Sequence, residues 1–98
     1  MDMETLMAQA ADLQTKISAA QDSLAQKQVR GIGGNGGVII TMTGKYDVLD
    51  VNINDAAMAG GAKNLSAFVM DAYKDAKDKA DTLIEKTMSE VTGSLSEE

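Results

Sequence analysis

The chain has 98 residues and a formal net charge of −6, and it contains neither cysteine nor histidine. This length allows one domain over residues 1–98, and the composition excludes disulfide frames, thiolate metal sites and catalysis by a Ser–His or Cys–His pair. Only one phenylalanine and two tyrosines are present, so the core of a monomer would be thin and we expect the chain to form an oligomer.

Residues 3–27 are predicted to form a long helix. Its apolar residues recur at alternating spacings of three and four, which is the mean period of a coiled-coil-like seam: Met3, Leu6, Ala10, Leu13, Ile17, Ala20 and Leu24. A lone helix of this length is marginal in water, so the seam is expected to pack against another helix. The pattern implies a partner for this helix without identifying it.

A glycine cluster, GIGGNGG, follows at residues 31–37 and formally matches the dinucleotide motif GxGxxG between Gly31 and Gly36. That motif needs a strand before it and a helix after it, whereas here a helix precedes and a strand follows. We therefore favour a hairpin turn at Asn35-Gly36, because both residues tolerate positive φ. The flanking strands are predicted at about residues 29–32 and 38–43.

A third strand is predicted at residues 47–53, after a turn at Gly44-Lys45-Tyr46. Leu49, Val51 and Ile53 alternate with polar residues. This alternation predicts an antiparallel sheet with one face under the helices and the other in water. The exposed edges of such a sheet are able to pair with a second copy of the chain.

A loop is predicted at residues 54–62, and a second long helix at residues 64–91 with Asn64 as its N-cap. Gly93 is expected to stop this helix, which leaves residues 93–98 as a short tail. The outer side of the helix interleaves lysines with carboxylates, and we expect the i, i+4 ion pairs Lys74–Asp78 and Lys77–Asp81. Such a face is a poor surface for phosphate.

Taken in order, these segments resemble the YbaB/EbfC family of nucleoid-associated proteins. The resemblance is carried by Val29-Arg30-Gly31, the glycine cluster, Gly44-Lys45, a strand ending in VNIN, and a last helix with Phe68, Asp71, Ala72 and Ala76. It implies an α+β subunit of order α-β-β-β-α, a homodimer, and sequence-tolerant binding of double-stranded DNA in the bacterial cytoplasm and nucleoid. The family's N-G-K-G turn is replaced here by Thr43-Gly44-Lys45-Tyr46, and the proline that commonly follows the third strand is missing.

The basic residues are unevenly distributed along the chain. Residues 14–46 hold four basic residues against Asp22, a net charge of +3, so the rest of the chain carries −9. Contacts to DNA phosphates need basic side chains free of neighbouring carboxylates. We therefore predict four DNA-binding residues: Lys16, Lys27, Arg30 and Lys45. No catalytic residue, cofactor, metal ion or small-molecule substrate is expected.

Two other functions remain open for a helix–sheet–helix chain. One is a prefoldin-like chaperone or assembly protein, and the other is a protein-binding adaptor that does not bind DNA. An enzyme is not expected, because the carboxylates lie on exposed helix faces with no sign of a pocket that would shift a pKa. No apolar run approaches the roughly 20 residues that a membrane span needs, and no signal pattern begins the chain, so a cytoplasmic protein is expected.

Overall fold

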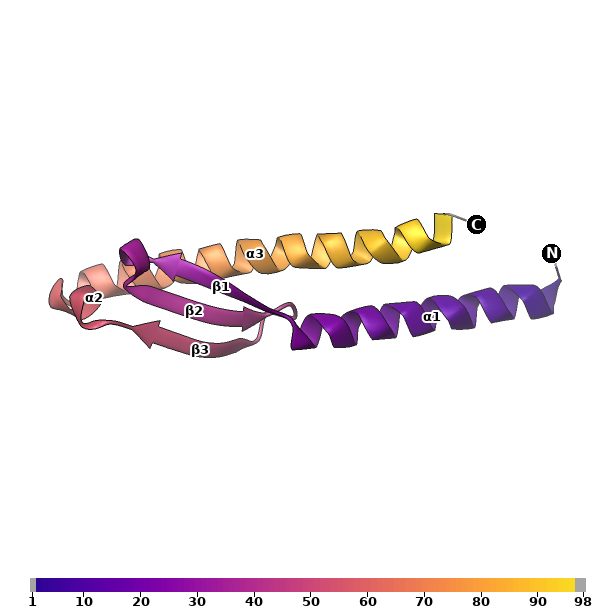
Figure 1. The fold of residues 1–98 in the computed structure, drawn as a ribbon, viewed down its shortest axis with the longest axis horizontal. Coiled ribbons are helices and arrows are strands. Elements are labelled where there is room, and N and C mark those ends of the chain that lie inside the picture. Colours follow the sequence, from indigo (N-terminus) through magenta and orange to yellow (C-terminus); the bar gives the residue numbers. More distant parts are fainter. Residues whose placement is uncertain (1, 97–98) are drawn as a thin grey trace.

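The computed structural model describes residues 2–96, and the side chains of residues 2–93. The molecule is an elongated body of 67 × 19 × 15 Å in which two long helices extend from a small sheet (Figure 1). The elements follow the predicted α-β-β-β-α order with one short helix added: α1 (Met3–Gln26), β1 (Gln28–Gly33), the 3₁₀ turn η1 (Gly34–Gly36), β2 (Val38–Thr43), β3 (Val48–Ile53), α2 (Asp55–Ala59) and α3 (Ala62–Ser96).

The sheet is antiparallel with the strand order β1-β2-β3, and α3 lies against one face of it (Figure 1). The helix comes closest to β1 at Gly31 and Gly33, which have no side chains to hold the two backbones apart. A Cβ atom added at Gly31 would lie 1.9 Å from the carbonyl oxygen of Ala72, and one at Gly33 would lie 2.1 Å from that of Phe68. These two glycines therefore allow the helix backbone to rest directly on the strand.

The hydrophobic core is small and lies between β2 and α3. β2 contributes Val38, Ile40 and Met42, and a stripe of small residues at every fourth position of α3 packs against the sheet: Ala72, Ala76 and Ala80. Ala57 of α2 closes one end of this cluster. Small side chains on the helix and glycines on the strand together explain how the two elements approach so closely.

The prediction that the alternating face of β3 is buried under the helices is wrong. Pairing with β2 places Val51 opposite Ile40 and Ile53 opposite Val38, so both lie on the side of the sheet that faces α3. They are nevertheless 46% and 38% exposed, because α3 covers β1 and β2 and leaves β3 beyond its reach. A β-bulge near Met42 also brings Val48, in place of Leu49, opposite that residue.

The glycine cluster does form a hairpin, but its turn differs from the predicted one. Strand pairing ends at Gly33 and Val38, so residues 34–37 form the connection. Positive φ occurs at three successive residues, with values of 59° at Gly34, 55° at Asn35 and 92° at Gly36. Within the cluster, Gly31 and Gly33 thus allow close packing against α3, and Gly34, Asn35 and Gly36 form the turn.

Three predictions about the second long helix are also wrong. It begins at Ala62, so Asn64 lies inside its first turn, where the side-chain amide donates a hydrogen bond to the carbonyl of Gly60. Asn54 caps a helix instead: it accepts from the backbone N–H of Ala57 in α2. Gly93 does not stop α3, which continues to Ser96. Gly93 does not adopt the positive φ with which a glycine commonly ends a helix. The remaining tail residues, 97–98, lie outside the described part of the chain.

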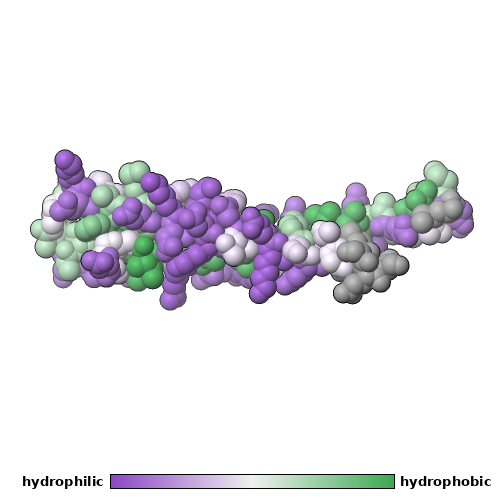
Figure 2. Space-filling model, turned by 90° about the horizontal axis from the view of Figure 1, so that it is seen from above, coloured by the Kyte–Doolittle hydropathy of each residue, from purple (hydrophilic) through white to green (hydrophobic). Residues whose placement is uncertain are grey.

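The seam predicted along α1 packs against α3 over part of its length. Ala20 and Leu24 are buried, whereas Met3 and Leu6 near the N-terminus are exposed. Figure 2 shows apolar surface at the end of the molecule where α1 extends away from the sheet. The predicted packing of the seam against another helix is therefore observed for its C-terminal half only.

Candidate nucleic-acid interface

The C-terminal end of α1 meets the β2–β3 turn, and three of the four predicted DNA-binding residues lie at or near this junction along the chain. The backbone N–H of Gly44 donates to the carbonyls of Leu24, at 2.9 Å, and Lys27, at 3.2 Å. These bonds satisfy carbonyls that the end of a helix leaves without partners. They also place Lys45, the next residue of the turn, next to Lys27, and Arg30 follows three residues later in β1.

The turn that carries Lys45 is held by side chains on both sides. The hydroxyl of Thr43 accepts hydrogen bonds from the backbone N–H groups of Lys45, at 3.1 Å, and Asp47, at 3.2 Å. Tyr46 adopts a positive φ of 69°, and its hydroxyl donates to Asp81 of α3. Lys77 lies 5.9 Å from the centre of the Tyr46 ring. The turn is therefore fastened to both helices, which fixes the backbone position of Lys45.

The hydrogen bond to Asp81, supported by burial and by nearby carboxylates, raises the pKa of Tyr46 above its usual value of about 10. A raised pKa means that the folded state favours the protonated phenol, so this stabilisation is present below pH 10 and is lost as the pH rises through the folded-state pKa. We expect Tyr46→Phe to lower the melting temperature at pH 8, and the difference from the parent protein to shrink above pH 10.

Melting curves at several pH values test this expectation. Tyr73→Phe is the matched control, because no hydrogen bond joins the Tyr73 hydroxyl to another residue of the described chain. A Tyr46→Phe difference that stays constant from pH 8 to pH 11 would show that the hydroxyl does not fasten the turn.

Arg30 lies on the face of the sheet that α3 does not cover. It is paired across the strands with Thr41, which is paired in turn with Asp50. A shallow hollow of about 280 Å³ borders it, lined also by Ile39 and Asn52. No ion pair joins the guanidinium to a carboxylate within residues 2–93. Arg30 is therefore exposed and forms no ion pair in this part of the chain, although the carboxylate of Asp50 lines the same hollow.

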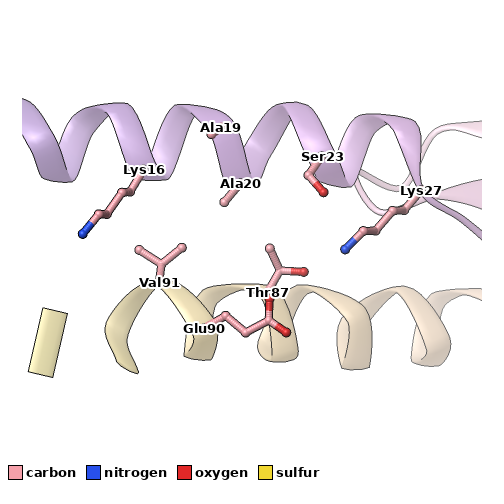
Figure 3. A pocket seen from close by; sticks show the side chains of 8 residues that line it. All are labelled: Lys16, Ala19, Ala20, Ser23, Lys27, Thr87, Glu90 and Val91. Carbon is pink, nitrogen blue, oxygen red and sulfur yellow. The ribbon is translucent and has the colours of Figure 1, made fainter. Parts of the chain in front are cut away.

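Lys16 and Lys27 flank a groove of about 350 Å³ between α1 and α3 (Figure 3). The groove is lined by Ala19, Ala20 and Ser23 from α1 and by Thr87, Glu90 and Val91 from α3. The ammonium of Lys16 lies 3.2 Å from the carboxylate of Asp12, so this candidate is not free of local acids. Lys16 also lies about 16 Å along the helix from Lys27, at 1.5 Å per residue. It stands apart from the cluster at the junction.

Two lysines of α3, unlike Lys27 and Lys45 at the junction, form ion pairs with carboxylates of their own helix. Lys77 pairs with Asp81 at 3.6 Å, as predicted, and Lys79 pairs with Asp75 at 3.0 Å. The predicted pair Lys74–Asp78 is not formed in the described part of the chain. Residues 2–96 contain no group of three or more acidic side chains placed to hold a metal ion, and none of their helices is long and apolar enough to cross a membrane.

A second surface was not foreseen from the sequence. Beside β3 an apolar hollow of about 370 Å³ opens between the sheet and α3, and it is lined by Ile40, Val48, Val51, Val69, Met70, Tyr73 and the stem of Lys74. The alternation of apolar residues in β3 predicts that one face of the strand is buried. It does not show whether the residues that bury this face belong to the same chain or to another.

Comparisons with known proteins show which family and which fold the chain resembles. The YbaB/EbfC DNA-binding family matches residues 1–95. A nucleoid-associated protein of Bradyrhizobium diazoefficiens is 37% identical over 95 residues, which cover 96% of this chain and 90% of that protein. One from Gluconobacter oxydans is 38% identical over 91 residues, covering 92% and 85%. An uncharacterized protein of Helicobacter pylori, known from its crystal structure, shares the fold at a TM-score of 0.73 with 15% identity, over 97% of both chains.

Proposed function

The chain belongs to the YbaB/EbfC DNA-binding family, and from this premise we propose that it is a nucleoid-associated protein of the bacterial cytoplasm that binds double-stranded DNA as a homodimer, with little sequence preference. Residues 1–98 would act as a single domain. The proposal is supported by the cluster formed along the chain by Lys27 and Lys45, which lie beside the capped end of α1, and Arg30, which follows three residues after Lys27. Phosphate contacts of this kind position a protein on DNA without reading its sequence.

The homodimer is supported by the apolar surface beside β3. Val51, Met70 and Tyr73 are between 43% and 58% exposed there, and a second copy of the chain would remove them from water. A two-fold dimer brings the same patch of each subunit together, so one apolar surface suffices to close it. Such a dimer carries the cluster of Lys27, Arg30 and Lys45 twice, which gives six basic side chains.

The net charge opposes DNA binding and makes it sensitive to salt. Two chains of charge −6 sum to −12, so binding depends on the local cluster. If about four of the basic side chains contact phosphates, the affinity should fall by about two orders of magnitude between 50 and 200 mM salt. DNA retardation across a salt series measures this slope.

The double variant Lys27→Ala/Arg30→Ala tests the location of the interface. It removes up to four phosphate contacts from the dimer, so we expect the affinity at low salt to fall by about tenfold or more and the salt slope to flatten. The matched control is Lys63→Ala/Lys86→Ala, which changes the charge equally. Both lysines are exposed on α3, away from the turn that carries Lys45. Retardation that is unchanged in the first variant and lost in the control would place DNA on α3 instead.

A protein-binding adaptor is the second candidate. It is favoured by the uncovered seam near the N-terminus of α1, where Met3, Leu6 and Met7 are exposed. Equally weak binding of DNA and of an acidic polymer would support the adaptor. A prefoldin-like assembly of many subunits is distinguished from both by a mass well above about 20 kDa, twice the chain mass of 10.3 kDa.

A further inference from the structure

The outer edge of β1 is occupied by two side chains of α3. On one side β1 pairs with β2 along its whole length. On the other side, the backbone N–H of Ile32 donates to the carboxylate of Asp75 at 2.9 Å, and the ammonium of Lys79 donates to the carbonyl of Arg30 at 2.7 Å. Asp75 and Lys79 also form an ion pair of 3.0 Å. The two side chains thus bond to the backbone on either side of Gly31.

These bonds imitate a neighbouring strand. An antiparallel neighbour offers an edge strand carbonyl oxygens for its N–H groups and N–H groups for its carbonyls. Here a carboxylate supplies the acceptor and an ammonium supplies the donor. The hydrogen bond from Ile32, together with Lys79, holds the pKa of Asp75 below its usual value, so the carboxylate is charged at neutral pH.

The opposite edge of the sheet is open. β3 is exposed over all six residues, and an apolar hollow lies beside it. An edge with free backbone groups and apolar neighbours is a template for pairing with another chain. The two edges of this sheet therefore differ. Side chains from α3 bond to the backbone of β1, whereas no side chain of the described residues bonds to the backbone of β3.

We propose that Asp75 and Lys79 close the β1 edge, so that a second copy of the chain adds only on the β3 side and assembly stops at the dimer. This inference rests on the homodimer proposed above. If the β1 edge were open as well, the β3 side of one chain would pair with the β1 side of the next. Such head-to-tail contacts produce rings where the rotation closes and open-ended assemblies where it does not, and both are larger than a dimer.

The double variant Asp75→Ala/Lys79→Ala removes both bonds to the edge. Its matched control is Asp78→Ala/Lys86→Ala, which removes one exposed acid and one exposed base from the same helix and likewise leaves the net charge at −6. Light scattering over a concentration series measures the mass. We expect about 20 kDa for the parent and the control at every concentration, and for the double variant at least a doubling that grows with concentration.

A third substitution tests whether the larger species pair through β1. Ile32→Pro, added to the double variant, removes the outward N–H while leaving the ladder to β2 intact, and proline is tolerated at an edge of this kind. We expect it to restore a mass of about 20 kDa. Larger species that persist in the triple variant would mean that they form elsewhere, which overturns the proposal.

Circular dichroism establishes that the variants remain helical. Should the double variant lose helix, Lys79→Met takes its place, because it removes only the donor to Arg30 and keeps the carboxylate of Asp75. A folded variant that keeps the parent mass at every concentration contradicts the closed edge. A parent protein of 10.3 kDa would contradict the homodimer instead, so the two failures are distinguishable.

Discussion

Replacing Gly31 with valine should cost about 3 kcal/mol of unfolding free energy or more. A Cβ at this position would lie 1.9 Å from the carbonyl oxygen of Ala72 and 2.3 Å from the backbone nitrogen of Ala76. Both are backbone atoms of α3, so no side-chain rotation relieves the clash. The helix would have to move off the strand, which would expose Ala72, Ala76 and the rest of the small core to water.

Urea unfolding followed by helicity measures this loss as a shift of the midpoint. Gly93→Ala is the matched control: nothing lies within 4 Å of its added Cβ, and its backbone is helical. We expect that variant to be as stable as the parent, or more stable by about 0.5–1 kcal/mol, because alanine favours helix over glycine. A Gly31→Val protein with the parent midpoint would show that α3 does not rest on β1.

The type and order of the elements were predictable because periodicity depends on local geometry alone. The seam of residues 3–27 and the β-branched run at Val38 each indicate one structure, and the observed α1 and β2 end within one residue of the predicted bounds. The sequence could not show that Gly31 serves packing, since glycine at a turn and glycine under a helix look alike. That distinction needs the distance to Ala72, a residue 41 positions away.

The candidate site was predictable in its charges and less so in its geometry. Lys27 and Lys45 come together only because Gly44 caps the end of α1, a tertiary contact that no local pattern announces. Lys16 was grouped with them on charge, but the fold leaves it along the helix, paired with Asp12. The apolar face of β3 was predictable from its alternation, but its burial under the helices was not, because the reach of α3 depends on its tertiary packing over β1 and β2.

Val51→Lys should convert the proposed homodimer into a monomer and weaken DNA binding by at least about tenfold. Val51 is 46% exposed in the single chain, so the subunit itself accommodates a lysine there. In the dimer the same ammonium would be buried twice against apolar residues without a partner, and a buried unpaired charge is strongly unfavourable. Light scattering is expected to report 10.3 kDa in place of about 20 kDa.

The choice of lysine separates the loss of the dimer from a change in charge. The substitution adds a positive charge, so weaker DNA retardation cannot result from repulsion; it follows because a monomer presents one basic cluster where the dimer presents two. Asn52→Lys is the matched control, because it adds the same charge at the neighbouring residue. Asn52 is paired with Ile39 and therefore lies on the opposite face of the sheet from Val51. We expect that protein to remain dimeric. If Asn52→Lys were monomeric and Val51→Lys dimeric, the subunits would meet through the face that carries Arg30, and the cluster would be buried between them instead of facing DNA.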